Sequence, residues 1–448
     1  MALFNKKNKQ TSNTSEKHYL TGKEIREIAK ANAVQMRELE KQKNRKCAEE
    51  EFLTQMKDSS NILEIEDLHS YFFTDQGIVK AVNGVSFSIP LNSTIGVVGE
   101  SGCGKSVTAM SVMRLLQGPS GQIVSGSIRF KANDYKKDSN GNFIPVYEYN
   151  EKGEIIQEEI ADKNGNVTLQ PKVKRDSTGF PIYEREEKTY DITKMPIKEM
   201  YRLRGRQISM VFQEPMTSLN PVFTIGNQLD EVSLLHIPGA TKDIAKKRSM
   251  DMLNMVGIAM PERVYNAYPH ELSGGMRQRV MIAMALAAEP RLIIADEPTT
   301  ALDVTIQAQI LDLFNDLKQR INGSILLITH DLGVIAEMAD YVIVMYAGRV
   351  IEQGTVFEIY DNPCHPYTQG LQKSKPTMSS SKDDLFNIPG NVPNPINMPN
   401  HCYFKERCNK CTEKCSKEYP GMHQISPTHF VACHLFDEFL EDQKKEAK

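Results

Sequence analysis

The sequence of 448 residues lacks a long apolar run, and this absence limits how the chain can meet a membrane. Its longest nearly unbroken apolar stretch, VMIAMALAA at 280–288, is about half of the roughly 20 residues that a membrane-spanning helix requires. The amino terminus, MALFNKKNKQ, is followed by polar residues and lacks the apolar core of a secretory signal. We therefore expect a cytoplasmic chain without transmembrane helices, whose membrane association depends on partner proteins.

The chain also lacks a strong net charge and a disulfide pattern. Its formal net charge is −3 and its isoelectric point is about 6.4, so nothing in the overall charge predicts binding to nucleic acid. Eight cysteines in a cytoplasmic protein do not indicate a disulfide framework, because that compartment keeps thiols reduced. Four of the eight lie between positions 402 and 415, so metal binding has to be considered there.

Changes in composition divide the chain into three parts. Residues 1–60 are rich in Lys, Glu, Gln and Asn, and Thr21 with Glu24 forms a capping-box pattern at the start of a predicted helix. The apolar stripe of this helix is thin and is interrupted by Asn32, which favours a solvated, charged arm. Residues 61–360 alternate strand and helix patterns that suit a parallel sheet covered by helices, and 361–448 are Pro- and Asn-rich, then Cys-rich.

A polar segment at about 132–190 interrupts the middle part. Three Asp-x-x-Gly turn signals begin at 138, 162 and 176, between short runs such as FIPVYEY. Turns of this composition are typical of β-hairpins. We interpret the segment as a surface insertion that leaves the functional motifs on either side intact.

Residues 99–106, GESGCGKS, form a complete phosphate-binding loop between an apolar strand and a helix, the context that this motif requires. The glycines allow backbone N–H groups to turn toward phosphates, Lys105 can reach the β- and γ-phosphate oxygens, and Ser106 can ligate Mg²⁺. The residues predicted to contact a nucleotide here are Gly99, Ser101, Gly102, Cys103, Gly104, Lys105, Ser106 and Val107.

Two further motifs suit the same chemistry. The strand RLIIAD ends in Asp296 and Glu297, so one carboxylate can hold magnesium while the other polarises an attacking water. Ser273, Gly274 and Gly275 open a helical run and place backbone donors at its amino terminus. A Ser-Gly-Gly turn alone is more often a simple helix cap, but its position between the other two motifs favours a second phosphate-binding element.

In this order the motifs resemble the nucleotide-binding domain of ATP-binding-cassette (ABC) ATPases over roughly 62–360, with 272–278 matching the family signature. The resemblance implies an α/β fold of the P-loop NTPase class, with a parallel-sheet core, a β-rich subdomain, a helical subdomain and, here, a carboxy-terminal Cys-containing module. Phe72 aligns with the aromatic residue that stacks on adenine, and Tyr71 is the alternative one position away.

The resemblance also assigns roles in hydrolysis. It implies that Gln213 contacts Mg²⁺ and senses the γ-phosphate, that His330 orients the hydrolytic water, and that Asp303 belongs to a loop at the dimer interface. The expected cofactors are therefore ATP and Mg²⁺, the metal being held by Ser106, Gln213 and Asp296. Catalysis is assigned to Lys105, Gln213, Glu297 and His330. Because the family holds ATP between the phosphate loop of one subunit and the signature of another, we expect a second cassette, most simply in a heterodimer.

Three segments resemble the ATP-binding subunits of oligopeptide and dipeptide permeases: QEPMTSLNP at 213–221, YPHELSGGMRQR at 268–279, and HPYT at 365–368. This resemblance implies two transmembrane permease subunits, an extracytoplasmic substrate-binding protein and a place at the cytoplasmic face of the cell membrane. Alternatives are an importer for another solute such as nickel chelates, an ABC ATPase of translation or DNA repair, and a non-catalytic regulatory cassette. The single cassette and the hairpin-rich insertion argue against the translation and repair types.

The tail cysteines Cys402, Cys408, Cys415 and Cys433 are spaced similarly to the cysteine module of this subfamily, which can hold a [4Fe-4S] cluster. Four thiolates suit an iron–sulfur cluster or tetrahedral zinc, and spacing alone does not separate these. Cys411 departs from the pattern and could replace a ligand. Four thiols without a metal are the remaining alternative.

Overall fold

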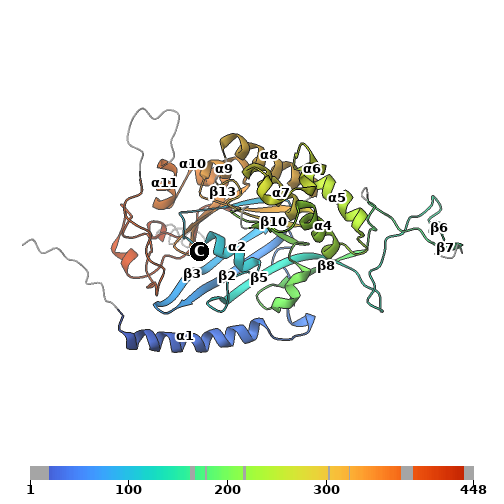
Figure 1. Cartoon of the computed structure of the whole chain (residues 1–448). Coiled ribbons are helices and arrows are strands. Elements are labelled where there is room, and N and C mark those ends of the chain that lie inside the picture. Colours follow the sequence, from blue (N-terminus) through green and yellow to red (C-terminus); the bar gives the residue numbers. More distant parts are fainter. Residues whose placement is uncertain are drawn as a thin grey trace, which may run out of the picture.

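Two β-sheets and a layer of helices form the body of the protein (Figure 1). The computed structural model describes residues 20–161, 167–176, 179–214, 218–300, 303–321, 323–374 and 387–437. The first sheet is antiparallel, in the order β1 (Leu53–Thr54), β8 (Arg185–Asp191), β5 (Gly121–Tyr135), β2 (Asn61–Thr74), β3 (Gly77–Pro90). It is the β-rich subdomain that the family resemblance implies.

The second sheet contains the parallel core. Its order is β14 (His423–Gln424), β15 (Phe430–Val431), β13 (Arg349–Thr355), β12 (Tyr341–Tyr346), β4 (Thr94–Val98), β11 (Ser324–Thr329), β10 (Leu292–Asp296), β9 (Ile208–Val211). The strands from β12 to β9 pair in parallel, as predicted, whereas β13, β15 and β14 extend one edge in antiparallel fashion. The carboxyl ends of the parallel strands therefore lie along one edge of the sheet.

Helices cover the face of the parallel sheet that is turned away from the antiparallel sheet (Figure 1). The α-helices are α1 (Gly22–Lys43), α2 (Lys105–Val112), α4 (Ile225–His236), α5 (Lys242–Met255), α6 (Pro261–Asn266), α7 (Gly274–Leu286), α8 (Val304–Ile321), α9 (Leu332–Met338), α10 (Val356–Asp361) and α11 (Pro366–Lys373). Short 3₁₀ turns are found at Glu49–Glu51, Ile197–Arg202, Pro269–Glu271, Glu413–Ser416 and His434–Phe436. Every helix in the described part of the chain is too short or too polar to cross a bilayer.

Alternation along the central strands builds a hydrophobic core on each side of the parallel sheet. In β10 all five residues are buried, with Leu292 and Ile294 packing toward the antiparallel sheet and α2. Ile293 and Ala295 pack instead among the residues of the helical layer. Because close-packed interiors resist deformation, these strands hold the loops at their ends in fixed positions.

Helix α1 lies along the antiparallel sheet, with most of its residues exposed (Figure 1). The predicted capping box is present, with the backbone N–H of Thr21 donating to Glu24 Oε2 at 2.7 Å. Asn32, which interrupts the apolar stripe, is the buried residue of this helix, and its Nδ2 donates to the carbonyl oxygen of Thr74 at 2.8 Å. Polar contacts therefore dock α1 on the sheet, and hydrophobic periodicity does not report them.

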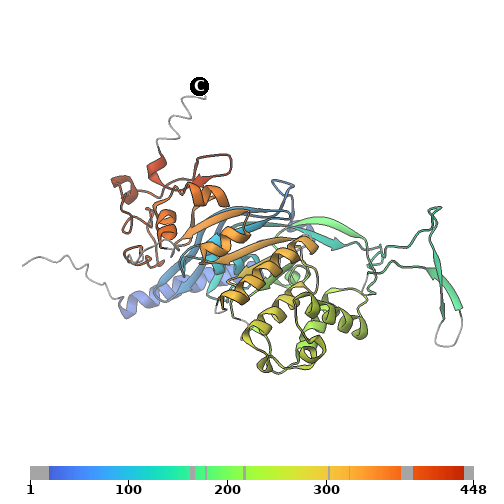
Figure 2. The same ribbon diagram turned by 90° about the horizontal axis from the view of Figure 1, so that it is seen from above.

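The insertion is shorter than predicted. Strands β5 and β8 pair from Arg129 with Asp191 to Tyr135 with Arg185, so the outer parts of the range 132–190 belong to the antiparallel sheet. The described residues of 136–161, 167–176 and 179–184 project from the body, with the hairpin β6 (Gln157–Ala161) and β7 (Val167–Pro171) at the far end (Figure 2). The turns at 138 and 176 form, whereas the one predicted at 162 lies outside the described residues.

Candidate nucleotide site

The sheet topology gathers the predicted site residues. The phosphate-binding loop follows β4, Gln213 follows β9, Glu297 follows β10 and His330 follows β11. These strands are hydrogen-bonded neighbours in parallel register, so all four segments leave the sheet at the same edge. In open α/β sheets this edge is where ligands bind.

The phosphate-binding loop folds tightly around its lysine. The Nζ of Lys105 donates to the carbonyl oxygens of Gly99 at 2.8 Å and Glu100 at 3.1 Å. Gly104 has a φ of 101°, and a Cβ at this position would lie 2.3 Å from the carbonyl oxygen of Ala81. Only glycine fits such a position, because the left-handed backbone and the close carbonyl both exclude a side chain.

The remaining residues of the loop differ in exposure. Ser101 and Gly102 are exposed at its tip, and Val107 is half-buried in the first turn of α2. Cys103 is buried, and burial raises the pKa of its thiol, so this residue offers a nucleotide its backbone and not its side chain. The loop thus presents backbone N–H groups, the arrangement that binds phosphate.

Ser106 and Asp296 meet at the start of α2. The hydroxyl of Ser106 donates to Asp296 Oδ1 at 2.9 Å. Burial raises the pKa of Asp296, and the neighbouring charge of Glu297 raises it further, whereas the Ser106 hydrogen bond lowers it. A hydroxyl beside a carboxylate is an oxygen-donor set of the type that Mg²⁺ uses.

Three side chains converge on the carboxylate of Glu297. Its Oε2 accepts hydrogen bonds from Gln213 Nε2 at 2.9 Å and Thr300 Oγ1 at 3.0 Å, and His330 Nδ1 lies 3.4 Å from it. Glu297 has a φ of 47°, an uncommon conformation for a residue with a side chain, and its N–H donates to the carbonyl of Ile328 at 2.8 Å. Sequence reasoning missed Thr300, for which the only signal is its position three residues after Glu297.

The signature residues form a second exposed helix start. Ser273 is the N-cap of α7, its Oγ accepting from Met276 N–H at 3.3 Å. Ser273 and Gly274 are exposed, and a Cβ built on Gly274 would meet no atom within 4 Å. Farther along α7, the buried Gln278 donates from Nε2 to the carbonyl oxygen of Pro298 at 2.6 Å. This bond links the signature helix directly to the segment that follows Glu297.

The loop predicted to cross a dimer interface is only partly described. Ala301 and Leu302 lie outside the described residues. Asp303 is exposed and caps α8, with Oδ1 accepting from Ile306 N–H at 2.9 Å. Its side chain therefore has a local structural role, and its predicted role at an interface stays a prediction.

The two candidate adenine-stacking residues have different surroundings. Tyr71 donates its hydroxyl to Asn83 Oδ1 at 3.0 Å, and burial raises its pKa. Phe72 carries no such polar anchor and lies next to Gly121 on β5. On β2 it alternates to the same side as Ser70, whose hydroxyl contacts that of Ser111 on α2 at 2.8 Å. Because α2 begins at the phosphate-binding loop, Phe72 is the better placed of the two.

The carboxy-terminal part of the chain contacts the phosphate-binding loop directly, which sequence reasoning missed. Arg407 makes two parallel hydrogen bonds to the carboxylate of Glu100, from Nη1 at 2.9 Å and Nη2 at 3.0 Å. The N–H of Glu100 donates to the hydroxyl of Tyr367, within the HPYT segment, at 2.8 Å. The guanidinium side chain is only 6% exposed. A fork-to-fork pair of this kind fixes orientation as well as charge.

The tail cysteines are neighbours in the structure. The N–H of Cys402 donates to the carbonyl of Cys415 at 3.0 Å. Burial, together with the neighbouring thiols, raises the pKa of Cys402 to about 11 and that of Cys433 to about 12. Among the described cysteines, however, no three sulfurs lie within 4.8 Å of one another.

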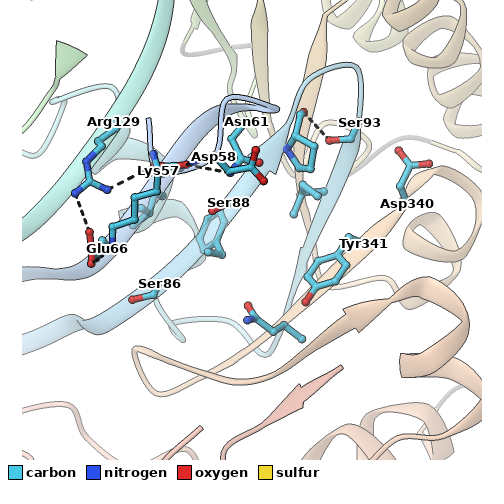
Figure 3. A pocket seen from close by; sticks show the side chains of 16 residues that line it. Lys57, Asp58, Asn61, Glu66, Ser86, Ser88, Ser93, Arg129, Asp340 and Tyr341 are labelled. Atoms are coloured by element: carbon cyan, nitrogen blue, oxygen red, sulfur yellow. Dashed lines mark hydrogen bonds and ion pairs between the residues drawn. The ribbon is translucent and has the colours of Figure 1, made fainter. Parts of the chain in front are cut away.

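A hollow of about 720 Å³ elsewhere on the protein does not belong to the nucleotide site (Figure 3). It lies beside Ser93 and Ile95, at the start of β4, whereas the phosphate-binding loop follows the end of that strand. Its polar lining includes Arg129, which donates from Nη2 to Glu66 at 2.9 Å (Figure 3). No residue predicted to bind nucleotide lines it.

Comparison with known proteins identifies two matching families. Residues 82–300 match the family described as ABC transporter, and residues 351–415 match the family described as oligopeptide/dipeptide transporter, C-terminal region. The chain is 42% identical over 379 residues to the oligopeptide transport ATP-binding protein AppD of Bacillus subtilis, covering 85% of this chain and 98% of that protein. It is 43% identical over 377 residues to OppD of B. subtilis, also named as an oligopeptide transport ATP-binding protein, covering 84% and 89%. To the dipeptide transport ATP-binding protein DppD of that organism it is 41% identical over 380 residues, covering 85% and 96%.

Proposed function

The chain belongs to the family of oligopeptide and dipeptide transport ATP-binding proteins of ABC transporters, and from this premise we propose how its residues act. It is the ATPase subunit of a peptide importer, in which ATP hydrolysis drives uptake. The observation that carries the mechanism is the convergence of Gln213, Thr300 and His330 on Glu297.

The loop after β4 binds the phosphates. Lys105 and the backbone N–H groups of the loop take up phosphate charge, because pre-oriented donors in a partly dry site stabilise it without reorganisation. Bound Mg²⁺ would supply Lewis-acid stabilisation of the phosphoryl oxygens, held by Ser106, Asp296 and Gln213. Gln213 can serve both the metal and Glu297, since its amide oxygen accepts while its amide nitrogen donates.

Glu297 is the residue that we assign as general base. Its carboxylate is oriented by Gln213 and Thr300, which leaves Oε1 to accept a hydrogen bond from the attacking water and then its proton. His330 is exposed, so its ring can turn toward the transferred phosphoryl group while remaining near Glu297. Catalysis on this account consists of positioning and electrostatics, as expected for phosphoryl transfer.

The substitution Glu297→Gln tests this assignment. We expect steady-state phosphate release by the assembled transporter to fall by about 100-fold or more, because general bases contribute about 10²–10⁴ in rate. ATP binding to the full-length chain should be retained, since the amide preserves size and can still accept from Gln213. The matched control is Glu38→Gln, an exposed acid on α1, which should leave hydrolysis unchanged. Hydrolysis within a few-fold of wild type in Glu297→Gln would refute the assignment.

A second ATPase subunit completes the site in our proposal. Exposed Ser273 and Gly274 present free helix-start donors on the surface, and Val304 at the start of α8 is 83% exposed. An apolar side chain this exposed beside a phosphate-binding element suits burial against another subunit. We infer a partner of similar fold, most simply in a heterodimer, with ATP held between the phosphate-binding loop of one subunit and the signature of the other.

The membrane subunits are assigned to the helical layer. A cavity of about 620 Å³ between the loop that follows α5, α6 and α7 is lined by Ile258, Met260 and Met276 among other residues, and Met260 is 55% exposed. Apolar grooves with flexible methionines suit an inserted helix. We place two transmembrane permease subunits here and at the equivalent surface of the second ATPase, with the chain at the cytoplasmic face and a substrate-binding protein on the other side. We propose no nucleic-acid partner for this chain.

We divide the chain functionally into an ATPase part at 61–360 and a carboxy-terminal module at 361–448, preceded by residues 1–60. For the module we propose a [4Fe-4S] cluster on Cys402, Cys408, Cys415 and Cys433, because four cysteine thiolates are the usual ligand set of such a cluster. Iron and sulfide analysis of anaerobically purified protein should give four of each per chain. A colourless, iron-free sample would overturn the cluster, whether it contained zinc or no metal.

A further inference from the structure

A thiol, an imidazole and a carboxylate meet in the interior, outside both the nucleotide site and the tail cysteines. One donor atom each of Glu352, Cys364 and His429 lie within 4.8 Å of one another. Glu352 is 0% exposed and His429 is 3% exposed, while Cys364 is half-buried. We propose that these three residues bind a transition-metal ion of the zinc class.

The sheet itself directs Glu352 into this position. The register between β12 and β13 shifts so that Val344 pairs with Glu352 and Met345 with Val350, which leaves Ile351 as an extra residue in β13. Such bulges re-aim side chains. Val350, Ile351 and Glu352 are buried in succession, because both faces of the sheet are covered here, and the carboxylate of Glu352 therefore lies in the interior.

The other two donors come from segments far away in the sequence. Cys364 immediately precedes α11, and His429 immediately precedes β15, which pairs with β13 at Glu352 and Val431. His429 Nε2 lies 2.9 Å from Glu352 Oε1. The backbone N–H groups of Cys364 and His365 donate to the two oxygens of Glu352 at 2.6 and 2.9 Å. These backbone donors orient the carboxylate, as outer partners of metal ligands commonly do.

The chemistry of the donors selects the class of ion. Thiolate and imidazole together favour zinc and similar first-row metals over calcium or magnesium, which prefer oxygen ligands. On binding, the sulfur–metal bond replaces the S–H bond of Cys364, and the nitrogen–metal bond replaces any N–H bond on the His429 nitrogen that faces Glu352. Every proton released from Cys364 or His429 passes to solvent, so no redox step is involved. Water completes the coordination, since three protein ligands leave one tetrahedral position open.

A simple ion pair would explain why Glu352 lies beside His429. It would not explain why the sulfur of Cys364 lies within 4.8 Å of donor atoms of both residues. The metal would bridge strand β13, the segment before α11 and the residue before strand β15, adding to the hydrogen bonds and apolar packing between these segments. Cys364 is three positions from Tyr367, whose hydroxyl accepts from Glu100 in the phosphate-binding loop. The ion therefore holds the segment that touches this loop.

Zinc titration of the full-length chain tests the proposal. The chain carries serine in place of Cys402, Cys408, Cys411, Cys415 and Cys433, so that no tail thiol can contribute, and is stripped of metal before titration against a coloured zinc chelator. We expect this parent to bind one equivalent of Zn²⁺, and addition of Cys364→Ser to abolish that equivalent. The matched control, Cys47→Ser, removes another half-buried thiol and should bind as the parent does. Equal binding with and without Cys364 would overturn the proposal.

A second measurement needs no substitution and so does not depend on a variant that folds. In the wild-type chain, Zn²⁺ at 100 times its dissociation constant should slow alkylation of Cys364 by about 100-fold, because only the metal-free fraction reacts. Peptide mass spectrometry follows Cys364 and Cys47 in the same sample. Alkylation of Cys364 that saturating Zn²⁺ leaves unchanged, or slows equally at Cys47, would show that Glu352 and His429 form a simple ion pair.

Discussion

The contact between Arg407 and Glu100 predicts that the carboxy-terminal module supports ATP binding. We consider Arg407→Gln, which removes both hydrogen bonds to the Glu100 carboxylate while keeping a shorter polar side chain. Hydrogen bonds to charged groups contribute about 1.5–3 kcal/mol. The lower part of that range applies here, because the carboxylate side chain is 26% exposed and water screens the pair.

A loss of about 1.5–2 kcal/mol corresponds to a roughly 10- to 30-fold weaker ATP complex, if the pair acts on the conformation of the phosphate-binding loop that binds ATP. If the pair stabilised the ATP-free and ATP-bound loops equally, the substitution would lower stability and leave ATP affinity unchanged. The two cases are therefore separated by measuring both quantities on the same variant.

Isothermal titration of the full-length chain with Mg²⁺·ATP gives the affinity, and thermal melting gives the stability. The set is wild type, Arg407→Gln, Glu100→Gln and the double variant, with Lys410→Gln as a control for an exposed cation near Arg407. Because the two residues act through one contact, the double variant should bind ATP no more weakly than the weaker single variant. Additive losses in the double variant, or an unchanged ATP affinity in Arg407→Gln, would refute the coupling.

Two further substitutions test the site and its attachment to the tail. Gly104→Ala should abolish measurable ATP binding, because the new Cβ would lie 2.3 Å from the carbonyl of Ala81 in a left-handed backbone; binding within threefold of wild type would contradict the account of the loop. Burial raises the pKa of Glu358, but hydrogen bonds from Ser426 and neighbouring groups lower it overall to about 2, below the value of 4.5 in an unfolded chain. The stability from Glu358 is therefore present above pH 4.5 and is lost as the pH falls toward 2, so between pH 5 and pH 3 the melting temperature of wild type should fall more than that of Glu358→Gln. Parallel curves for the two proteins would contradict this assignment.

The sequence allowed the central sheet and the order of the motifs to be predicted, because both depend on local patterns. A strand followed by a glycine loop, by paired acids or by a histidine can be recognised from its local sequence. Parallel pairing then brings the ends of such strands together, however long the segments that connect them. For this reason the insertion at 136–184 leaves the site intact. Thr300 and the engagement of Glu297 by Gln213 required coordinates, since nothing in their spacing reports a hydrogen bond.

Contacts between distant segments were not predictable from one sequence. Arg407 meets Glu100 across 307 positions, and Asn32 meets Thr74 through a single amide that breaks the apolar pattern of α1. The composition change near 360 also suggested a separate module, yet β14 and β15 of that module extend the main sheet through β13. Tertiary packing determines each of these contacts, and hydrophobic periodicity carries no signal for them.

Peptide uptake by the reconstituted transporter tests the central claim most directly. Proteoliposomes would contain this chain, its partner ATPase and the membrane subunits, with the substrate-binding protein and a labelled oligopeptide outside and ATP inside. We predict accumulation that requires ATP and falls to background with Glu297→Gln in this chain. Undiminished uptake with that variant, or ATP hydrolysis by the complex without any uptake of peptide, would contradict the account.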